Sequence, residues 1–325
     1  MADTPTLNVP RQARTSGTSM PRVDAVEKVR GETRYLLDRL PEGAWFGGAV
    51  RSPVPHGRLR TLRLGSAFDF SRVVVVGPGG IPGENTIAMV ERDMPCLAHD
   101  EVRYRGEPLM LVAAPDRATL AAALAAVRVE LDPLPALVGI DAVAALGRSS
   151  PDLLENLYHL DIARGEAAAA LAGADLVVEG EYLTPPQEHV YLEPQGIVAL
   201  PLPGGGVRIV GSLQCPYYIQ PAVAAVLGVA AEQVVVEQWA TGGAFGGKED
   251  YPSVIAAHAA LLARVAGRPV VFDHDRQLDI EVTTKRHASW TRVRAGVRRD
   301  GTFVALEAEF VIDGGAYVTL SPVGL

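Results

Sequence analysis

The sequence TGGAFGGKED at residues 241–250 places four glycines within six positions. It follows a predicted strand, residues 234–238, and precedes a predicted helix, residues 251–265. Glycine lets the backbone approach a ligand closely, and free N–H groups ahead of a helix attract an anion or an electron-rich oxygen. The stretch therefore predicts a binding loop between a strand and a helix.

A nucleotide triphosphate is a poor fit to this loop. Gly242, Gly247 and Lys248 match the first part of a phosphate-loop pattern, but Glu249 stands where that pattern needs a Ser or Thr to ligate Mg²⁺. A carboxylate at this position would repel the phosphates. A purely structural glycine turn is the other interpretation, and it does not explain the Phe245 and Glu249 embedded among the glycines.

Composition narrows the class of protein. The chain has 325 residues, with 38 acidic and 30 basic side chains, so its net charge is −8. An acidic chain without a basic block is not expected to bind nucleic acid, because phosphate neutralisation needs clustered Lys and Arg. Its two cysteines, Cys96 and Cys215, have no partner at zinc or iron–sulfur spacing, so no metal cluster is expected on this chain.

The sequence shows no export or membrane signal. Its first twenty residues lack an apolar core, so they do not resemble a secretory signal. The longest apolar stretch, residues 253–272, is interrupted by His258, Arg264 and Arg268, which predicts a packed helix and strand and no membrane span. We expect a cytoplasmic protein.

The first predicted domain covers residues 22–146, after an extended tail at residues 1–21. A strand over 102–113, a helix over 117–126 and a strand over 127–131 form a predicted βαβ-type unit. Asp116 is placed to cap the helix.

A predicted linker over residues 147–175 ends in a short Ala-rich helix, and the second domain runs from 176 to 325. The apolar patterns predict further elements there: a helix over 219–227 and strands over 176–182, 196–200, 207–211, 234–238, 270–273, 290–298 and 303–312. Glycine-containing turns at 203–206 and 299–301 predict two hairpins. Because the sequence stops within strand-like residues, we expect this domain to be completed by another chain, unless the sequence is a fragment.

Two further segments belong with the glycine loop. Residues 186–194, PQEHVYLEP, gather two carboxylates, a His and an amide before a strand, and Gln214 stands at the end of another strand. Each segment alone is weak evidence for a functional site, and His189 by itself is expected to be a structural histidine.

Together these segments resemble the molybdenum-binding subunit of the xanthine dehydrogenase and aldehyde oxidase family, over nearly the whole chain. The blocks that carry the resemblance are 22–28 with Arg34 and Tyr35, 50–56, 104–108 with 112–116, 187–193, Gln214 and 242–250. The resemblance implies an α+β fold, in which an N-terminal α/β hammerhead domain precedes the first part of a molybdopterin-binding α+β domain.

The resemblance also implies roles for individual residues. Gln214 lies beside the molybdenum and hydrogen-bonds its ligand sphere, and Phe245 lines the apical oxo group, without either side chain ligating the metal. The implied cofactor-binding residues are Gln214, Gly242, Gly243, Ala244, Phe245, Gly246 and Gly247. Glu249 is implied to face the substrate.

The implied activity is hydroxylation with water as the oxygen source. The implied cofactor is a molybdenum-pterin, as molybdopterin or its cytidine dinucleotide form, shared with a partner chain. Electrons would pass to [2Fe–2S] clusters and FAD on partner subunits. Ala244 is typical of aldehyde oxidases and Glu249 of purine-oxidising members. Because Glu249 is the one that touches substrate, a purine-like N-heterocycle is favoured over an aldehyde.

The chain is less than half as long as the usual subunit of this family, and the expected catalytic Glu lies in the missing part. None of Glu155, Glu188, Glu193 and Glu249 matches that motif. We therefore expect a second molybdopterin-binding chain to supply it, and no activity from this chain alone. The alternative is a non-catalytic truncated scaffold that docks to iron–sulfur and flavin partners. Gln214, Phe245 and Glu249 argue against that alternative.

Overall fold

The computed structural model describes residues 17, 19–87, 89–149 and 159–324. The chain separates into two compact units, residues 1–34 and 35–325. The first contains helix α1 (Ala25–Arg30), which ends at Gly31 with a φ of 69°. Most of the predicted tail, residues 1–21, lies outside the described residues, as do residues 150–158 of the predicted linker.

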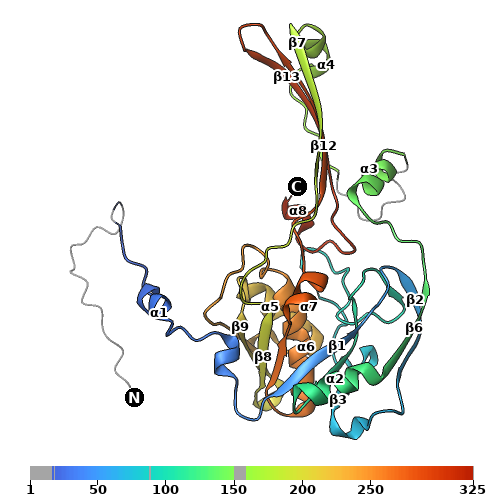
Figure 1. The fold of residues 1–325 in the computed structure, drawn as a ribbon, viewed down its shortest axis with the longest axis vertical. Coiled ribbons are helices and arrows are strands. Elements are labelled where there is room, and N and C mark those ends of the chain that lie inside the picture. Colours follow the sequence, from blue (N-terminus) through green and yellow to red (C-terminus); the bar gives the residue numbers. More distant parts are fainter. Residues whose placement is uncertain (1–16, 18, 88, 150–158, 325) are drawn as a thin grey trace. The chain divides into compact units, whose positions relative to one another are not determined.

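A mixed sheet forms the centre of the second unit, in the order β10-β9-β8-β11-β1-β5-β3 among the described residues. Its strands are β1 (Trp45–Arg51), β3 (Val74–Val76), β5 (Pro108–Ala114), β8 (Gly196–Pro201), β9 (Val207–Ser212), β10 (Val234–Gln238) and β11 (Val270–Asp273). This sheet takes strands from both predicted domains, so the two share one core, and the boundaries at 146 and 175 stay predictions (Figure 1).

The main core lies between this sheet and two helices, α5 (Pro216–Leu227) and α6 (Tyr251–Ala266). Every residue of α6 from Tyr251 to Ala263 is buried. The other face packs against α2 (Arg117–Ala126), which Asp116 caps as predicted by accepting from the Thr119 N–H (2.7 Å). The prediction of a mixed α+β fold is confirmed.

The predicted βαβ unit is wrong. Its first strand, β5, is central in the large sheet and runs antiparallel to β1. The strand after α2, β6 (Val127–Pro133), pairs instead with β2 (Gly57–Leu64), which also pairs with β4 (Glu101–Val102). The reason is burial: every residue of β5 is buried, whereas β6 alternates between half-buried and exposed and so suits an open antiparallel sheet.

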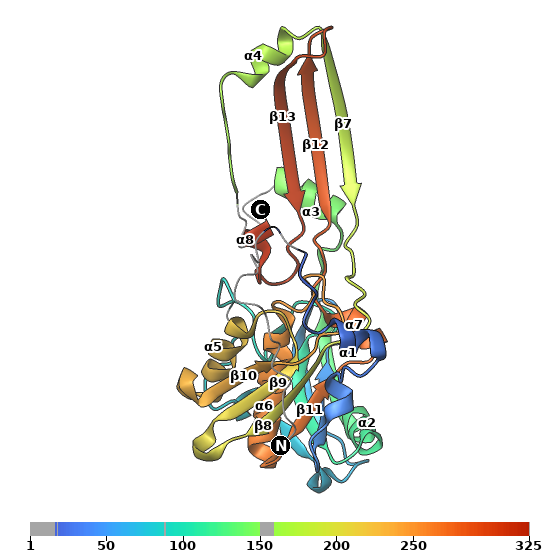
Figure 2. The same cartoon turned by 90° about the vertical axis from the view of Figure 1, so that its left-hand side faces the viewer.

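A third sheet, here named the projecting sheet, has the order β13-β12-β7 and extends away from the large sheet (Figure 2). Its strands are β7 (Leu176–Thr184), β12 (Ser289–Val297) and β13 (Phe303–Ile312). Both predicted hairpins, β8 with β9 and β12 with β13, are confirmed as antiparallel pairs.

The remaining helices are short. They are α3 (Ile140–Ser149), α4 (Ala167–Ala172), α7 (Arg276–Val282) and α8 (Ser321–Gly324), with 3-10 turns at Leu36–Arg39, Phe70–Arg72, Pro78–Gly80, Pro203–Gly205 and Ala231–Gln233. No helix within the described residues is long and apolar enough to span a membrane.

Candidate functional site

The glycine loop between β10 and α6 has an unusual backbone. Gly243 and Gly246 have φ values of 98° and 89°, and Phe245 has a φ of 54°, which is uncommon for a non-glycine residue. At Gly247 the reason for glycine is a close approach: a Cβ atom would lie 2.6 Å from Cε1 of Tyr191. The residues of this loop are therefore fixed by conformation and packing.

Gln214, between β9 and α5, holds this loop. Its backbone N–H donates to the Lys248 carbonyl (2.8 Å), and its side-chain Oε1 accepts from the N–H groups of Gly246 and Lys248 (3.2 Å each). Two donors on Oε1 settle the orientation of the amide. Its Nε2 then faces away from them, and it donates to no acceptor among the described residues. The structure thus brings together two parts of the predicted site.

Three consecutive backbone donors in the loop are free. Within the described residues, the N–H groups of Gly243, Ala244 and Phe245 meet no acceptor. Successive N–H groups in such turns form a concave site for an anion or a polarised oxygen. With the Gln214 Nε2, the loop presents four donors from neighbouring positions and no competing carboxylate acceptor for them.

A buried cation, Lys248, links the loop to the neighbouring segments. Lys248 is fully buried, and its Nζ donates to the Glu193 carbonyl (2.7 Å) and to Ser212 Oγ (2.8 Å). Its Nζ also lies 3.5 Å from the Glu193 carboxylate, which accepts from the Gly242 N–H (2.7 Å). Burial lowers the pKa of Lys248 to about 8, and the Glu193 charge opposes that shift.

A second polar layer fixes the far end of the loop. Gln195 Nε2 donates to the Gly247 carbonyl (2.7 Å) and to the Tyr191 hydroxyl (2.9 Å), which in turn donates to Asp279 Oδ1 (3.1 Å). Burial raises the pKa of Asp279, and Arg276 lies 3.1 Å from its carboxylate. Sequence reasoning missed this layer, because nothing in its spacing distinguishes it from ordinary polar residues.

Two titratable side chains flank Gly246. A Cβ atom at Gly246 would lie 3.9 Å from Glu249 Oε1 and 3.8 Å from His189 Nε2. Glu249 is half-buried, and its carboxylate pairs with no cation among the described residues. Glu188 is different, since it forms an ion pair with Lys285 (2.6 Å). Glu249 is therefore the carboxylate next to the loop that remains available to a ligand.

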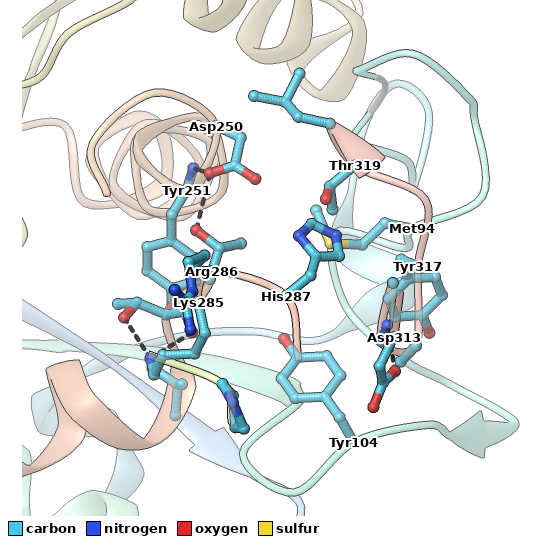
Figure 3. Close-up of a pocket in the computed structure, with 18 of the residues that line it drawn as sticks. Met94, Tyr104, Asp250, Tyr251, Lys285, Arg286, His287, Asp313, Tyr317 and Thr319 are labelled. Carbon is cyan, nitrogen blue, oxygen red and sulfur yellow. Dashed lines mark hydrogen bonds between the residues drawn. The ribbon is translucent and has the colours of Figure 1, made fainter. Parts of the chain in front are cut away.

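A cavity of about 380 Å³ opens beside this point (Figure 3). Gly246, His189 and Asp250 line it on the loop side; Glu249, Gln214 and Phe245 are not part of the described wall. Asp250 caps the N-terminus of α6, and its carboxylate accepts from Thr284 Oγ1 (3.0 Å). Burial raises the pKa of this carboxylate.

The rest of the cavity wall was not predicted from the sequence. It includes Tyr104, Lys285, Arg286, His287, Asp313, Tyr317 and Thr319 (Figure 3). Tyr317 donates to Glu107 Oε1 (2.5 Å), and His287 Nε2 lies 2.8 Å from Ser321 Oγ. Most of these residues come from segments that border strands of the projecting sheet, so only the tertiary fold brings them to the loop.

Large apolar side chains on the loop, beside Glu193 and at the start of α5 are exposed. Phe245 is 76% exposed, Leu192 91% and Tyr217 85%. Exposed apolar clusters at a polar binding loop are typical of surfaces that another molecule covers. Of the glutamates considered as a catalytic base, Glu193 and Glu188 are held by Lys248 and Lys285, and Glu155 lies outside the described residues.

Comparisons with known proteins agree with this geometry. Residues 150–325 match the molybdopterin cofactor-binding domain family, and residues 30–135 match the a/b hammerhead domain of aldehyde oxidase and xanthine dehydrogenase. The nicotinate dehydrogenase large molybdopterin subunit of Eubacterium barkeri is 32% identical, over 94% of this chain and 72% of that protein. A probable xanthine dehydrogenase subunit of Bacillus subtilis is 31% identical, over 93% of this chain and 40% of that protein.

A solved structure shows the same arrangement. Quinoline 2-oxidoreductase from Pseudomonas putida 86 superposes with a TM-score of 0.81 and 26% identity, over 93% of this chain and 40% of that one. The chain thus spans less than half the length of most of these relatives. It belongs to the molybdenum hydroxylase family of xanthine dehydrogenases and aldehyde oxidoreductases, and corresponds to the hammerhead domain and the start of the molybdopterin-binding domain of the large subunit.

Proposed function

We propose that this chain forms one half of the molybdenum site of a hydroxylase that oxidises a purine-like N-heterocycle, with water as the oxygen source. Electrons would leave through iron–sulfur and flavin partners. The observation that carries the proposal is the set of four free donors, three loop N–H groups and Gln214 Nε2, in a loop that borders a cavity at Gly246 and has the unpaired Glu249 carboxylate beside that glycine.

The donor set fits a molybdenum-pterin cofactor. Oxygen atoms on the metal and on the pterin are hydrogen-bond acceptors, and the loop offers three free N–H donors together with the Gln214 Nε2. Gln214 and residues 242–247 would hold the cofactor, which when bound supplies a Lewis-acidic, two-electron redox centre. The Lys248–Glu193 pair and the Gln195 amide keep the loop in its donor conformation before any ligand arrives.

Within the site, each residue has a definite task. Gln214 Nε2 donates a hydrogen bond, and its orientation is fixed because Oε1 is already occupied by Gly246 and Lys248. The Phe245 ring shields one side of the loop from water once a partner covers it. Glu249 accepts a hydrogen bond from a ring N–H of the substrate.

Glu249 supports a heterocyclic substrate. Glu249 is half-buried, and a bound ligand that excludes water would leave its carboxylate without a donor unless the ligand supplies one, so the site favours a substrate with a polar ring edge over a simple aldehyde. The names of three relatives refer to ring-nitrogen compounds: nicotinate, xanthine and quinoline. Ala244 is the one loop feature that points towards an aldehyde, and it shapes only the backbone.

The other half of the site would come from a second molybdopterin-binding chain that carries the catalytic Glu. The exposed Phe245, Leu192 and Tyr217 around the loop are then the side chains that this second half covers. On this proposal the isolated chain binds no molybdopterin and has no turnover.

The cofactor proposal is tested by purifying the chain with its partners and measuring molybdenum and pterin. We expect molybdenum in the wild-type complex and about 10- to 100-fold weaker cofactor retention in Gln214→Ala, because a hydrogen bond to a charged group contributes about 1.5–3 kcal/mol. Gln277→Ala, on the exposed face of α7, is the matched control and should behave as wild type. A metal-free complex with intact partners would instead establish the scaffold interpretation.

The substrate proposal is tested with hypoxanthine and benzaldehyde, using an artificial electron acceptor. Glu249→Val should lower kcat/KM for hypoxanthine by about 10- to 100-fold and leave benzaldehyde nearly unchanged. An equal loss for both substrates would assign Glu249 to folding or cofactor binding. Turnover by the isolated chain would refute the shared site.

A further inference from the structure

The projecting sheet has one face without charged side chains, here named the open face. Because side chains alternate along strands, the register places one set of residues from all three strands on this face. They are Leu176, Val178, Gly180, Tyr182 and Thr184 of β7, Ser289, Thr291, Val293, Ala295 and Val297 of β12, and Phe303, Leu306, Ala308, Phe310 and Ile312 of β13.

The open face is apolar and uncovered. Six of its large side chains are more than half exposed: Leu176, Val178, Tyr182, Phe303, Leu306 and Phe310. Each of the side chains that it takes from the central strand β12 is half-buried. A contiguous apolar surface of this kind on a sheet is typical of an interface.

The opposite face of the same sheet carries paired charges and is covered at one end by a helix. There Arg294 lies 2.7 Å from Glu179 and 2.8 Å from Glu307, which forms a charge ladder suited to water. Helix α4 covers its far end, where a Cβ atom on Gly296 would meet Leu171 and Ala174 at 3.1 Å. Figure 1 shows α3 and α4 together on this side, and Figure 2 looks onto the other. The contrast between the two faces indicates that another molecule, and not water, normally covers the open face.

The size of the open face limits what covers it. With nine residues in β7, the face is about 30 Å long and about 14 Å wide, on the order of 400 Å². A standard interface needs about 800 Å² from each partner, so two copies packed through this face alone would supply about half. A stable partner must therefore also contact surface beyond the open face.

The base of the projecting sheet leads directly into the cavity wall. Pro186 follows β7, residues 284–288 precede β12, and residues 313–320 follow β13, and all three stretches contribute to the wall. A polypeptide that covers the open face can therefore continue over the cavity beside the glycine loop. That extension provides the missing area.

We propose that the open face is the docking surface for a second chain, the one that carries the rest of the molybdopterin-binding domain. This inference rests on the function proposed above. The longer relatives supply the argument for the occupant, since the aligned span covers only 40% of the Bacillus subtilis protein. The occupant presents an uncharged apolar surface to Phe310, Leu306 and Tyr182.

The test uses the purified complex and the second chain produced by itself. The double variant Leu306→Ser with Phe310→Ser should weaken association about 100-fold, from the loss of two buried apolar side chains. Glu309→Ser, on the neighbouring position but the opposite face, is the matched control and should bind as wild type. Equal binding by the double variant and the control would overturn the inference.

A photocrosslinker at position 310 identifies the occupant without relying on folding of a variant. The expected product joins position 310 to a peptide of the second chain, and the same group at position 309 should give none. Crosslinks to another copy of this chain, or to a continuation of the same polypeptide, would overturn the assignment. Molybdenum analysis separates the two proposals: a molybdenum-containing complex with no crosslink refutes only the docking surface, and a metal-free complex with the crosslink refutes only the cofactor proposal.

Discussion

Removing the buried cation beneath the glycine loop should destabilise the chain strongly. Lys248 has no exposed side-chain surface, and its partner Glu193 has 17%. Lys248→Met keeps most of the side-chain volume over the Tyr191 ring, which lies 4.6 Å from Nζ. The substitution deletes the charge and the hydrogen bonds to Ser212 Oγ and the Glu193 carbonyl.

The expected magnitude follows from the geometry. Removing one partner of a buried ion pair costs about 3–5 kcal/mol, because the other charge is left uncompensated. The Gly242 N–H and Ser212 hydroxyl still donate to Glu193, so we expect the lower end, about 3 kcal/mol. Glu193→Gln should cost about as much. Burial depresses the pKa of Lys248, which means that the pair contributes little net stability.

The double variant Glu193→Gln with Lys248→Met should therefore cost about 3–4 kcal/mol, and additivity would give about 6 kcal/mol. Equilibrium urea unfolding of the chain measures all four proteins. Arg208→Met is the matched control, since its pair with Glu237 is 46% and 42% exposed and should cost under about 1 kcal/mol. A Lys248→Met variant within about 1 kcal/mol of wild type, or an additive double variant, would refute the buried-pair argument.

Two further predictions concern the core. Gly47→Ala in β1 should cost about 1–3 kcal/mol in the free energy of unfolding, because its Cβ would lie 2.8 Å from Phe272 and 2.9 Å from Leu262; Gly79→Ala, with nothing within 4 Å, should be neutral. His258 is fully buried and burial lowers its pKa to about 3, so the unfolded chain binds its proton first as the pH falls below about 6.5. Between pH 7 and pH 5 wild type should thus lose about 2 kcal/mol more than His258→Leu, and equal losses would show that His258 does not titrate on unfolding.

Sequence patterns predicted the second half of the fold better than the first. The strand over 270–273 and the hairpin ending at 312 were predicted close to the bounds that the structure has, because apolar alternation and glycine turns coincide there. Strand β1 was missed because Gly47 and Gly48 interrupt its pattern. Close packing requires glycine at position 47, because the residue lies against Phe272 and α6. Local sequence patterns do not reveal such a tertiary contact.

The sequence grouped the segments that meet in the candidate site, but it did not identify the buried residues that support them. Gln214 and the glycine loop were grouped from the sequence, and the structure joins them through two hydrogen bonds to Oε1. The role of Lys248 could not be read from the sequence, where it served only to test a phosphate-loop pattern. Burial and contacts with Glu193, 55 residues away, determine that role, and both are properties of the tertiary fold.

The groups that support the loop and the exposed apolar surfaces proposed to bind a partner are separate in this chain. The loop is shaped by contacts within this chain: the Glu193 carboxylate accepts from the Gly242 N–H, Lys248 pairs with Glu193, and Gln195 Nε2 donates to the Gly247 carbonyl. The uncovered apolar surface lies elsewhere, at the rim of the loop and on the open face. A change on the open face should therefore remove a partner and leave the loop conformation intact. A change at Lys248 should disturb the loop while the open face, built from a different sheet, still binds.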